Sequence, residues 1–131
     1  MKGLVIALDP SHDILIHGLM QAGYQVENHH QASIDDLKTR WPEAVGLIVR
    51  GRLPINHEHL QQATSLQWIG RLGSGLEHID VVAANKMGIA CYAAPEGNRV
   101  ALGEHLVGML LAHTPKVALA HEQVKQGLWD R

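Results

Sequence analysis

Residues 68–80 read WIGRLGSGLEHID, and they give the strongest indication of how this chain folds. An apolar run ends in Gly73-Ser74-Gly75, and the residues after it have the pattern of a helix start. A strand that ends in glycines is typical of α/β proteins, in which bare backbone amides approach an anionic ligand. The stretch therefore predicts a strand followed by a ligand-binding loop.

The same alternation of short apolar runs and helical patterns extends in both directions from this stretch. Strands are predicted at residues 4–8, 24–27, 45–49, 66–72 and 89–93. Helices are predicted at residues 12–22, 34–41, 56–63, 80–87, 98–113 and 115–126. Strands that alternate with helices indicate βαβ units and right-handed crossovers. The sequence thus predicts an α/β fold with a flavodoxin-like, doubly wound, five-stranded parallel sheet in a three-layer αβα arrangement.

Local signals place several helix ends. Ser33 is predicted to cap a helix that ends near Trp41-Pro42, and Gly88 is predicted to end the helix at 80–87. The helix at 98–113 is apolar nearly all round, which predicts burial on more than one side.

Composition excludes several classes of protein. The chain has 131 residues, which fits one domain, and a formal net charge of -2 without any basic run, which argues against nucleic-acid binding. No apolar stretch has membrane-spanning length, and the five apolar residues at 4–8 are too few for a secretory signal. The single cysteine, Cys91, excludes an internal disulfide and is interpreted as a strand thiol rather than a nucleophile. We expect a soluble, cytoplasmic protein.

Positive charge and glycine gather at the carboxyl ends of the predicted strands. Arg50 and Arg52 follow the third strand, and Arg71 and residues 73–75 end the fourth. Ligands bind at this edge of an open α/β sheet, and arginine forks suit carboxylates and phosphates. The residues predict a site for a small organic anion, with the alternative that the arginines pair with local carboxylates and the glycines merely turn the chain.

A dinucleotide site within this chain is not favoured. The dinucleotide fingerprint is Gly-x-Gly-x-x-Gly after the first strand, whereas Gly70 to Gly75 have the reverse spacing and follow the fourth strand. Gly103 and Gly108 lie inside a predicted helix. Ten histidines show no spacing typical of metal ligands, and Ser74 lacks the Gly-x-Ser-x-Gly context of a nucleophile.

The order and spacing of these motifs resemble the D-isomer-specific 2-hydroxyacid dehydrogenases, most of all their phosphoglycerate dehydrogenase branch. The resemblance runs from the first strand to Gly127-Leu128-Trp129. It is carried by LIVRGR at residues 47–52, IGRLGSGLEHID at 69–80, GI at 88–89, APEGN at 94–98 and GEH at 103–105.

The resemblance implies a division of labour between two domains. Residues 1–131 resemble the substrate-binding domain, with 98–131 as an interdomain helical region. The cofactor domain, which holds the family's catalytic arginine, acidic residue and histidine, is expected after Arg131. The implied enzyme is an NAD(P)-dependent oxidoreductase of 2-hydroxy acids. The chain alone is then expected to hold no catalytic residue, to lack turnover and not to bind NAD(P) tightly.

Site residues implied by the resemblance fall into two groups. The substrate-binding group comprises Arg50, Gly51, Arg52, Arg71, Gly73, Ser74 and Gly75. The cofactor-contacting group comprises Asn98 and Leu102. Three residues depart from the family pattern: Gly51, where serine is frequent, Leu102, where a small or β-branched residue is frequent, and Gly103, where alanine is usual.

Two other functions stay open beside the substrate-binding domain. One is a stand-alone flavodoxin-like module that binds a ligand or self-associates without catalysis. The other is a flavin role, which is disfavoured because residues 9–12 lack a phosphate cradle. If the helix at 98–113 is exposed, we expect a homodimer, with exchange of that helix through a hinge at 94–98 as one route.

Overall fold

A computed structural model describes residues 2–113 and 116–129. The chain divides into two compact units, Met1–Pro95 and Glu96–Arg131, called here the sheet unit and the helical unit. The predicted helix start at residue 115 lies outside the described residues.

The sheet unit contains a five-stranded, all-parallel sheet, as predicted. The strands are β1 (Gly3–Ala7), β2 (Tyr24–Asn28), β3 (Ala44–Val49), β4 (Trp68–Arg71) and β5 (Ala90–Tyr92). Their order in the sheet is β2-β1-β3-β4-β5. The registers of β1, β3 and β4 align their carboxyl ends, with Ala7 beside Ile48 and Val49 beside Arg71. The loops that follow these three strands therefore open at one edge.

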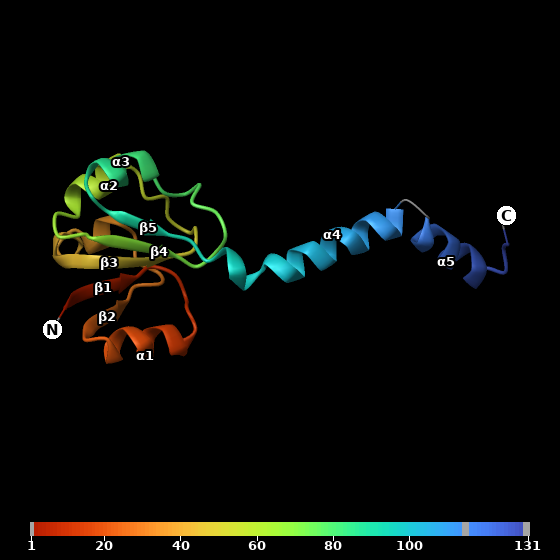
Figure 1. Cartoon of the computed structure of the whole chain (residues 1–131), viewed down its shortest axis with the longest axis horizontal. Helices are drawn as coiled ribbons and strands as arrows, with labels where there is room; N and C mark the ends of the chain where they lie inside the picture. The colour runs from red at the N-terminus through yellow and green to blue at the C-terminus, as the bar shows by residue number, and fades with distance from the viewer. Residues whose placement is uncertain (1, 114–115, 130–131) are drawn as a thin grey trace. The chain divides into compact units, whose positions relative to one another are not determined.

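Helices lie on both faces of this sheet, which confirms the three-layer prediction. Figure 1 shows α1 (Asp13–Gln21) on one face and α2 (His57–Gln62) with α3 (Val81–Lys86) on the other. Side chains cap the two short helices: Asn56 accepts a hydrogen bond from His59 N, and Asp80 accepts one from Ala83 N.

Two apolar clusters fill the spaces between the layers. The larger one includes Leu47 and Ile69 of the sheet and the fully buried Trp41, whose Nε1 donates to His59 O at 2.7 Å. The smaller one joins Val5 and Ile48 of the sheet to apolar residues of α1. Since both faces are covered, the continuous apolar runs of β1 and β3 are buried.

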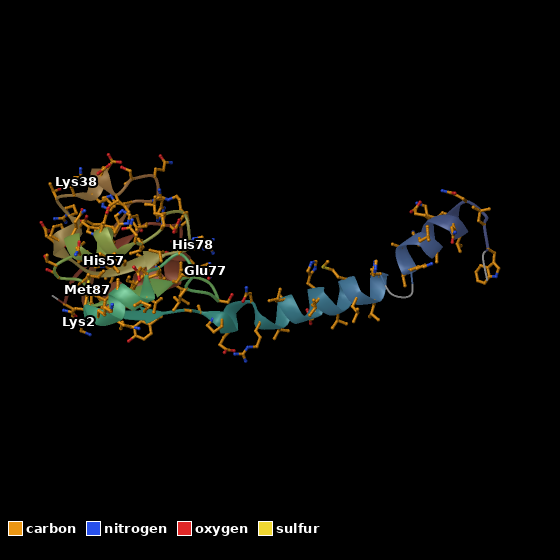
Figure 2. All side chains as sticks on the ribbon, turned by 90° about the horizontal axis from the view of Figure 1, so that it is seen from above. Lys2, Lys38, His57, Glu77, His78 and Met87 are labelled. Atoms are coloured by element: carbon orange, nitrogen blue, oxygen red, sulfur yellow. The ribbon has the colours of Figure 1, made fainter. Side chains whose placement is uncertain are left out.

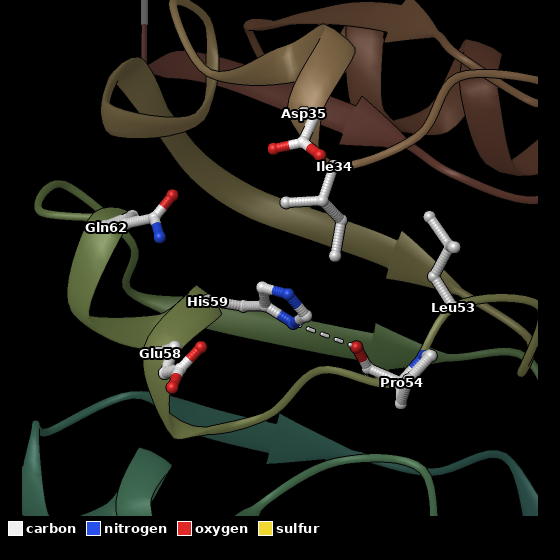
Figure 3. Close-up of a pocket in the computed structure, with 7 residues that line it drawn as sticks. All are labelled: Ile34, Asp35, Leu53, Pro54, Glu58, His59 and Gln62. Carbon is white, nitrogen blue, oxygen red and sulfur yellow. Dashed lines mark hydrogen bonds between the residues drawn. The ribbon is translucent and has the colours of Figure 1, made fainter.

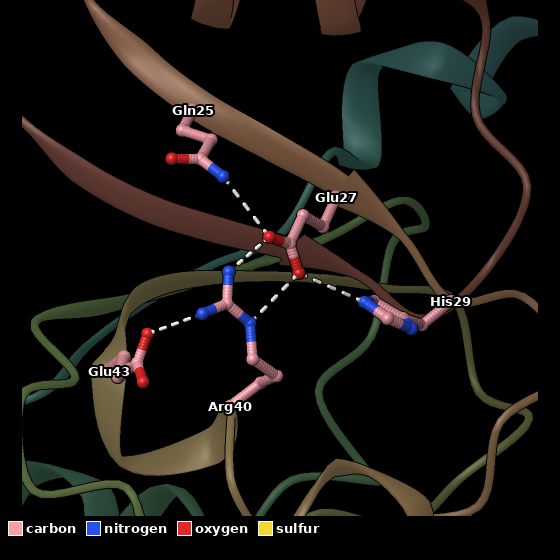
Figure 4. Close-up of polar contacts among 5 residues, drawn as sticks. All are labelled: Gln25, Glu27, His29, Arg40 and Glu43. Atoms are coloured by element: carbon pink, nitrogen blue, oxygen red, sulfur yellow. Dashed lines mark hydrogen bonds and ion pairs between the residues drawn. The ribbon is translucent and has the colours of Figure 1, made fainter.

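The predicted helix at 34–41 is wrong. Ser33 does cap a turn, because its Oγ accepts from Asp36 N at 3.2 Å, but only two 3₁₀ turns form, η1 (Asp35–Leu37) and η2 (Trp41–Glu43). A helix this short is marginal in water, and Pro42 would end it. Figure 4 shows a stronger tertiary constraint, in which Arg40 Nε donates to Glu27 Oε2 of β2 at 3.2 Å.

The helical unit has no buried residue among those that the structure describes. It comprises α4 (Arg99–His113) and α5 (Val117–Lys125), preceded by a 3₁₀ turn, η3 (Pro95–Gly97). Every residue of α4 is exposed, so the burial predicted for residues 98–113 is not supplied within the described chain. No described helix is long and apolar enough to cross a membrane.

Candidate anion-binding site

Two loops at the carboxyl edge of the sheet form the candidate site. Loop 50–56 follows β3, and loop 72–80 follows β4. A single parallel β-bridge between Ile55 and Ile79 joins them. In this bridge, Ile55 N donates to His78 O and Asp80 N donates to Ile55 O, both at 2.8 Å. Ile55 and Ile79, the paired residues, are buried. The two loops are therefore held together by backbone hydrogen bonds and by the core.

Asp9 anchors loop 50–56 from the end of β1. Its side chain is 6% exposed, and Oδ2 accepts from Arg50 N at 2.5 Å and from Gly51 N at 3.3 Å. A buried carboxylate that accepts backbone amides fixes the loop that supplies them. Asp9 was not among the predicted site residues, although an acidic residue directly after a buried strand is a signal that the sequence does carry.

Arg52 uses its guanidinium inside the protein. Its Nη2 donates to Leu8 O at 2.9 Å, its Nη1 donates to Ala32 O at 3.0 Å, and its Nε lies 3.6 Å from Asp9 Oδ1. These contacts connect loop 50–56 to the segments that follow β1 and β2. The predicted substrate contact by Arg52 would have to share donors that backbone carbonyls already occupy.

Arg71 is also engaged by its neighbours. Its Nε donates to Arg50 O at 2.8 Å, and its Nη2 lies 3.4 Å from Glu77 Oε1. The guanidinium lies against Gly73, where an added Cβ would overlap it. Arg71 therefore pairs with groups of the protein itself, as the alternative interpretation of the arginines predicted. The lack of a side chain at Gly73 leaves room for the Arg71 guanidinium.

The Arg50 side chain and two backbone amides have no partner in the described residues. The Arg50 side chain is exposed and has no hydrogen-bond or ion-pair partner within residues 2–113 and 116–129. Over the same residues, Ser74 N and Gly75 N have no acceptor, whereas Gly73 N donates to Arg71 O. An arginine fork and unpaired backbone amides are groups that suit a small carboxylate.

Gly51 and His78 bring the two loops into close approach. Gly51 has φ +155°, and a Cβ there would lie 3.0 Å from His78 Cδ2. A serine at this position would require His78 to shift. Figure 2 shows His78 next to Glu77 at one end of the sheet unit, with Lys2 and Met87 at the other end.

The cofactor contacts expected from Asn98 and Leu102 fall in the helical unit. Asn98 O accepts from Leu102 N at 2.9 Å and so begins α4, and Leu102 is 62% exposed. Their role in contacting the cofactor stays a prediction.

The end of β1 does not fit the pyrophosphate of a dinucleotide. It lacks glycine, the buried Asp9 carboxylate lies there, and His12 Nδ1 already accepts from Ile14 N at 3.2 Å at the start of α1. A negative charge and an occupied helix amide are opposite to what a phosphate needs. The end of β1 thus lacks the glycines and free helix amides that hold a pyrophosphate.

A separate pocket lies between η1 and α2 and differs in charge from the candidate site. Figure 3 shows this pocket, about 350 Å³ in volume, with His59 Nδ1 3.0 Å from Pro54 O. Its lining includes Ile34, Asp35, Leu53, Pro54, Glu58, His59 and Gln62. Two carboxylates make it unsuitable for an anion.

Other chemistry has little support in the described residues. Among them, no group of three or more histidines, cysteines or acidic residues is suited to hold a metal ion. Cys91 is partly buried in β5 against the core, and burial raises the pKa of its thiol, which disfavours the reactive thiolate.

The fold and the two coupled loops define an α/β domain whose carboxyl edge carries arginines and unpaired backbone amides. The chain matches the catalytic domain of the D-isomer specific 2-hydroxyacid dehydrogenases over residues 5–125. It belongs to this family of oxidoreductases, as the sequence motifs predicted.

Relatives of known name support the phosphoglycerate dehydrogenase branch. A D-3-phosphoglycerate dehydrogenase of Archaeoglobus fulgidus is 32% identical over 127 residues, which cover 97% of this chain and 24% of that protein. The Rattus norvegicus D-3-phosphoglycerate dehydrogenase is 31% identical over 113 residues, which cover 86% of this chain and 21% of that protein. The chain thus spans about a quarter of the length of the curated relatives it matches.

Solved structures agree with this assignment. PH0520 from Pyrococcus horikoshii OT3 superposes with a TM-score of 0.88 at 25% identity, covering 100% of this chain and 39% of that one. An NAD⁺-bound 3-phosphoglycerate dehydrogenase of Entamoeba histolytica gives a TM-score of 0.65 at 25% identity, covering 84% of this chain and 38% of that one.

Proposed function

We propose that this chain is the substrate-binding part of an NAD(P)-dependent 2-hydroxyacid dehydrogenase and binds the anion of a small 2-hydroxy or 2-oxo acid. The observation that carries the proposal is the set of unpaired donors at the carboxyl edge: the Arg50 guanidinium and the amides of Ser74 and Gly75. Loops 50–56 and 72–80 present these donors on a backbone fixed by Asp9 and by the Ile55–Ile79 bridge.

Binding the carboxylate would orient the acid for hydride transfer at C2. A domain that holds the substrate in one orientation raises the reaction rate even if the catalytic residues lie in another domain. Arg50 supplies the charge and the two amides supply direction, whereas Arg52 and Arg71 support the loops and contact substrate only if their present partners release them. The nicotinamide cofactor and the catalytic groups belong, in this proposal, to the rest of the enzyme, in the cytoplasm.

The binding step is tested by titrating the ¹⁵N-labelled chain with D-lactate. We expect the Ser74 and Gly75 amide signals to shift, and we expect Arg50→Gln to weaken binding about tenfold because it removes the charge. Arg99→Gln, a matched change in the helical unit, should leave the Kd unchanged. Equal affinities of the Arg50→Gln variant and the parent chain would contradict the proposal.

The division of labour is tested by activity. The pure 131-residue chain should not oxidise NADH with glyoxylate, hydroxypyruvate or 3-phosphohydroxypyruvate, measured at 340 nm. Measurable turnover by the chain alone would show that the catalytic groups lie within it.

A self-associating module is the second candidate, and the exposed apolar side chains of the helical unit favour it. These include Val100, Leu102, Leu106, Val107, Met109, Leu110 and Leu111 of α4. An apolar surface this extensive is typical of an interface. We propose that α4 is covered by the cofactor domain or, in the isolated chain, by a second copy. Light scattering over a dilution series should show a dimer, and a monomer mass at all concentrations would contradict it.

A further inference from the structure

The Arg71–Glu77 pair lies along the glycines of loop 72–80. An added Cβ at Gly73 would overlap the Arg71 guanidinium, and one at Gly75 would overlap the Glu77 carboxylate. The side chains reach back over the loop and meet each other, with Arg71 Nη2 3.4 Å from Glu77 Oε1. The side chains of Arg71, at the end of β4, and of Glu77 therefore lie against the two glycines.

Glu77 takes contacts that resemble those of a bound carboxylate. A hydrogen bond from its own backbone N–H, together with the nearby charge of Arg71, lowers the pKa of Glu77 below its usual value. An arginine and a backbone amide are also what a small organic acid would use at this loop. The loop thus already holds one carboxylate, and this carboxylate belongs to the protein.

This arrangement is weak enough to be displaced. The Glu77 side chain is 62% exposed, and its 3.4 Å separation from Arg71 is long for an ion pair. Exposed pairs of this kind contribute little to stability. Arg71, by contrast, is 16% exposed and is held by Arg50 O, so it would stay in place when Glu77 leaves.

We propose that Glu77 is a specificity-determining residue that competes with the ligand carboxylate for Arg71. An acid must displace the Glu77 side chain to reach Arg71, so the loop accepts only ligands whose contacts outweigh the internal pair. The inference rests on the proposed function, because it assumes that loop 72–80 binds an anion.

The test replaces the Glu77 charge while keeping its size. Glu77→Gln should lower the Kd for D-lactate about three- to tenfold, since one negative charge within a few ångströms of the ligand is removed. Glu58→Gln on α2 changes the net charge equally, away from the loop, and should leave the Kd unchanged. Lactamide, the neutral isostere of lactate, should bind the Glu77→Gln and Glu58→Gln variants with equal Kd. Kd values come from amide shifts of Ser74 and Gly75 in the ¹⁵N-labelled chain.

A second substitution tests the same point without an amide group. Glu77→Ala should also bind D-lactate more tightly, and adding Arg71→Lys to Glu77→Gln should remove most of the gain. If D-lactate binds the parent and both Glu77 variants with one Kd while Arg50→Gln weakens binding, the anion site stands and the role of Glu77 is wrong. If D-lactate shifts no amide of loop 72–80 in any variant, the proposed function fails and this inference fails with it.

Discussion

The sheet unit and the helical unit use similar aliphatic residues with opposite results. All the buried hydrophobic residues that the structure describes lie in the sheet unit, whereas the leucines and valines of α4 and α5 are exposed. A sheet presents two faces that helices cover, but a helix that is apolar all round needs partners on several sides. Hydrophobic composition therefore marks a core only where the fold supplies a facing element.

The largest expected effect contrasts two apolar side chains. Trp41→Ala should lower the free energy of unfolding by about 3–5 kcal/mol, because it empties a fully buried volume and removes the hydrogen bond to His59 O. Leu106→Ala on α4 should change it by less than about 0.5 kcal/mol in the monomer. Urea unfolding followed by circular dichroism measures both. A cost for Leu106→Ala similar to that of Trp41→Ala would mean that α4 is buried in solution.

Removal of the buried carboxylate at the sheet edge should have the next largest effect. Asp9→Ala leaves the amides of Arg50 and Gly51 without their acceptor and should cost about 2–3 kcal/mol. It should also weaken D-lactate binding, since loop 50–56 loses its anchor. The control is Asp13→Ala at the exposed start of α1, which should cost about 0.5 kcal/mol. Equal thermal unfolding of the two variants would contradict an anchoring role for Asp9.

Glu27 provides a pH-dependent test. Hydrogen bonds from Arg40, above all, and from His29 lower its pKa, so the folded state favours the charged carboxylate. The resulting stability is present above the ordinary glutamate pKa of about 4.3 and is lost as the pH falls through the lower folded value. Glu27→Gln should therefore cost about 1 kcal/mol at pH 7 and progressively less below pH 4.

The matched control for Glu27 lies in the helical unit. Glu104→Gln on the exposed α4 should leave the pH dependence of unfolding as it is in the parent chain. Parallel stability curves for Glu27→Gln and the parent between pH 3 and 7 would show that the Glu27–Arg40 contact has no influence on folding.

The smallest effect is expected at Ser11. Its Oγ is buried and has no hydrogen-bond partner in the described part of the chain. Ser11→Ala should thus be neutral or stabilise the sheet unit by up to about 1 kcal/mol. Ser33→Ala, which removes a hydroxyl paired with Asp36, should instead cost about 0.5–1 kcal/mol. Destabilisation by Ser11→Ala would indicate a partner for Ser11 in solution, such as water.

The sequence predicted the sheet because burial on both faces leaves a continuous apolar run in β1 and β3. It failed at residues 34–41, where the pairing of Arg40 with Glu27 spans 13 residues and overrides local helix signals. Spacing also placed arginines and glycines at one edge. The spacing could not show which arginine is available to a ligand. Acceptors within the protein occupy the guanidinium groups of Arg52 and Arg71, and only the folded structure shows this.

The Ile55–Ile79 bridge has a consequence for the cost of ligand binding. Two free loops would each lose conformational entropy when a ligand ordered them, and this loss would subtract from the affinity. Here, two hydrogen bonds of 2.8 Å and two buried isoleucines join the loops when the chain folds. The ordering cost is met during folding, so a small acid with few atoms to contribute meets a nearly rigid receptor.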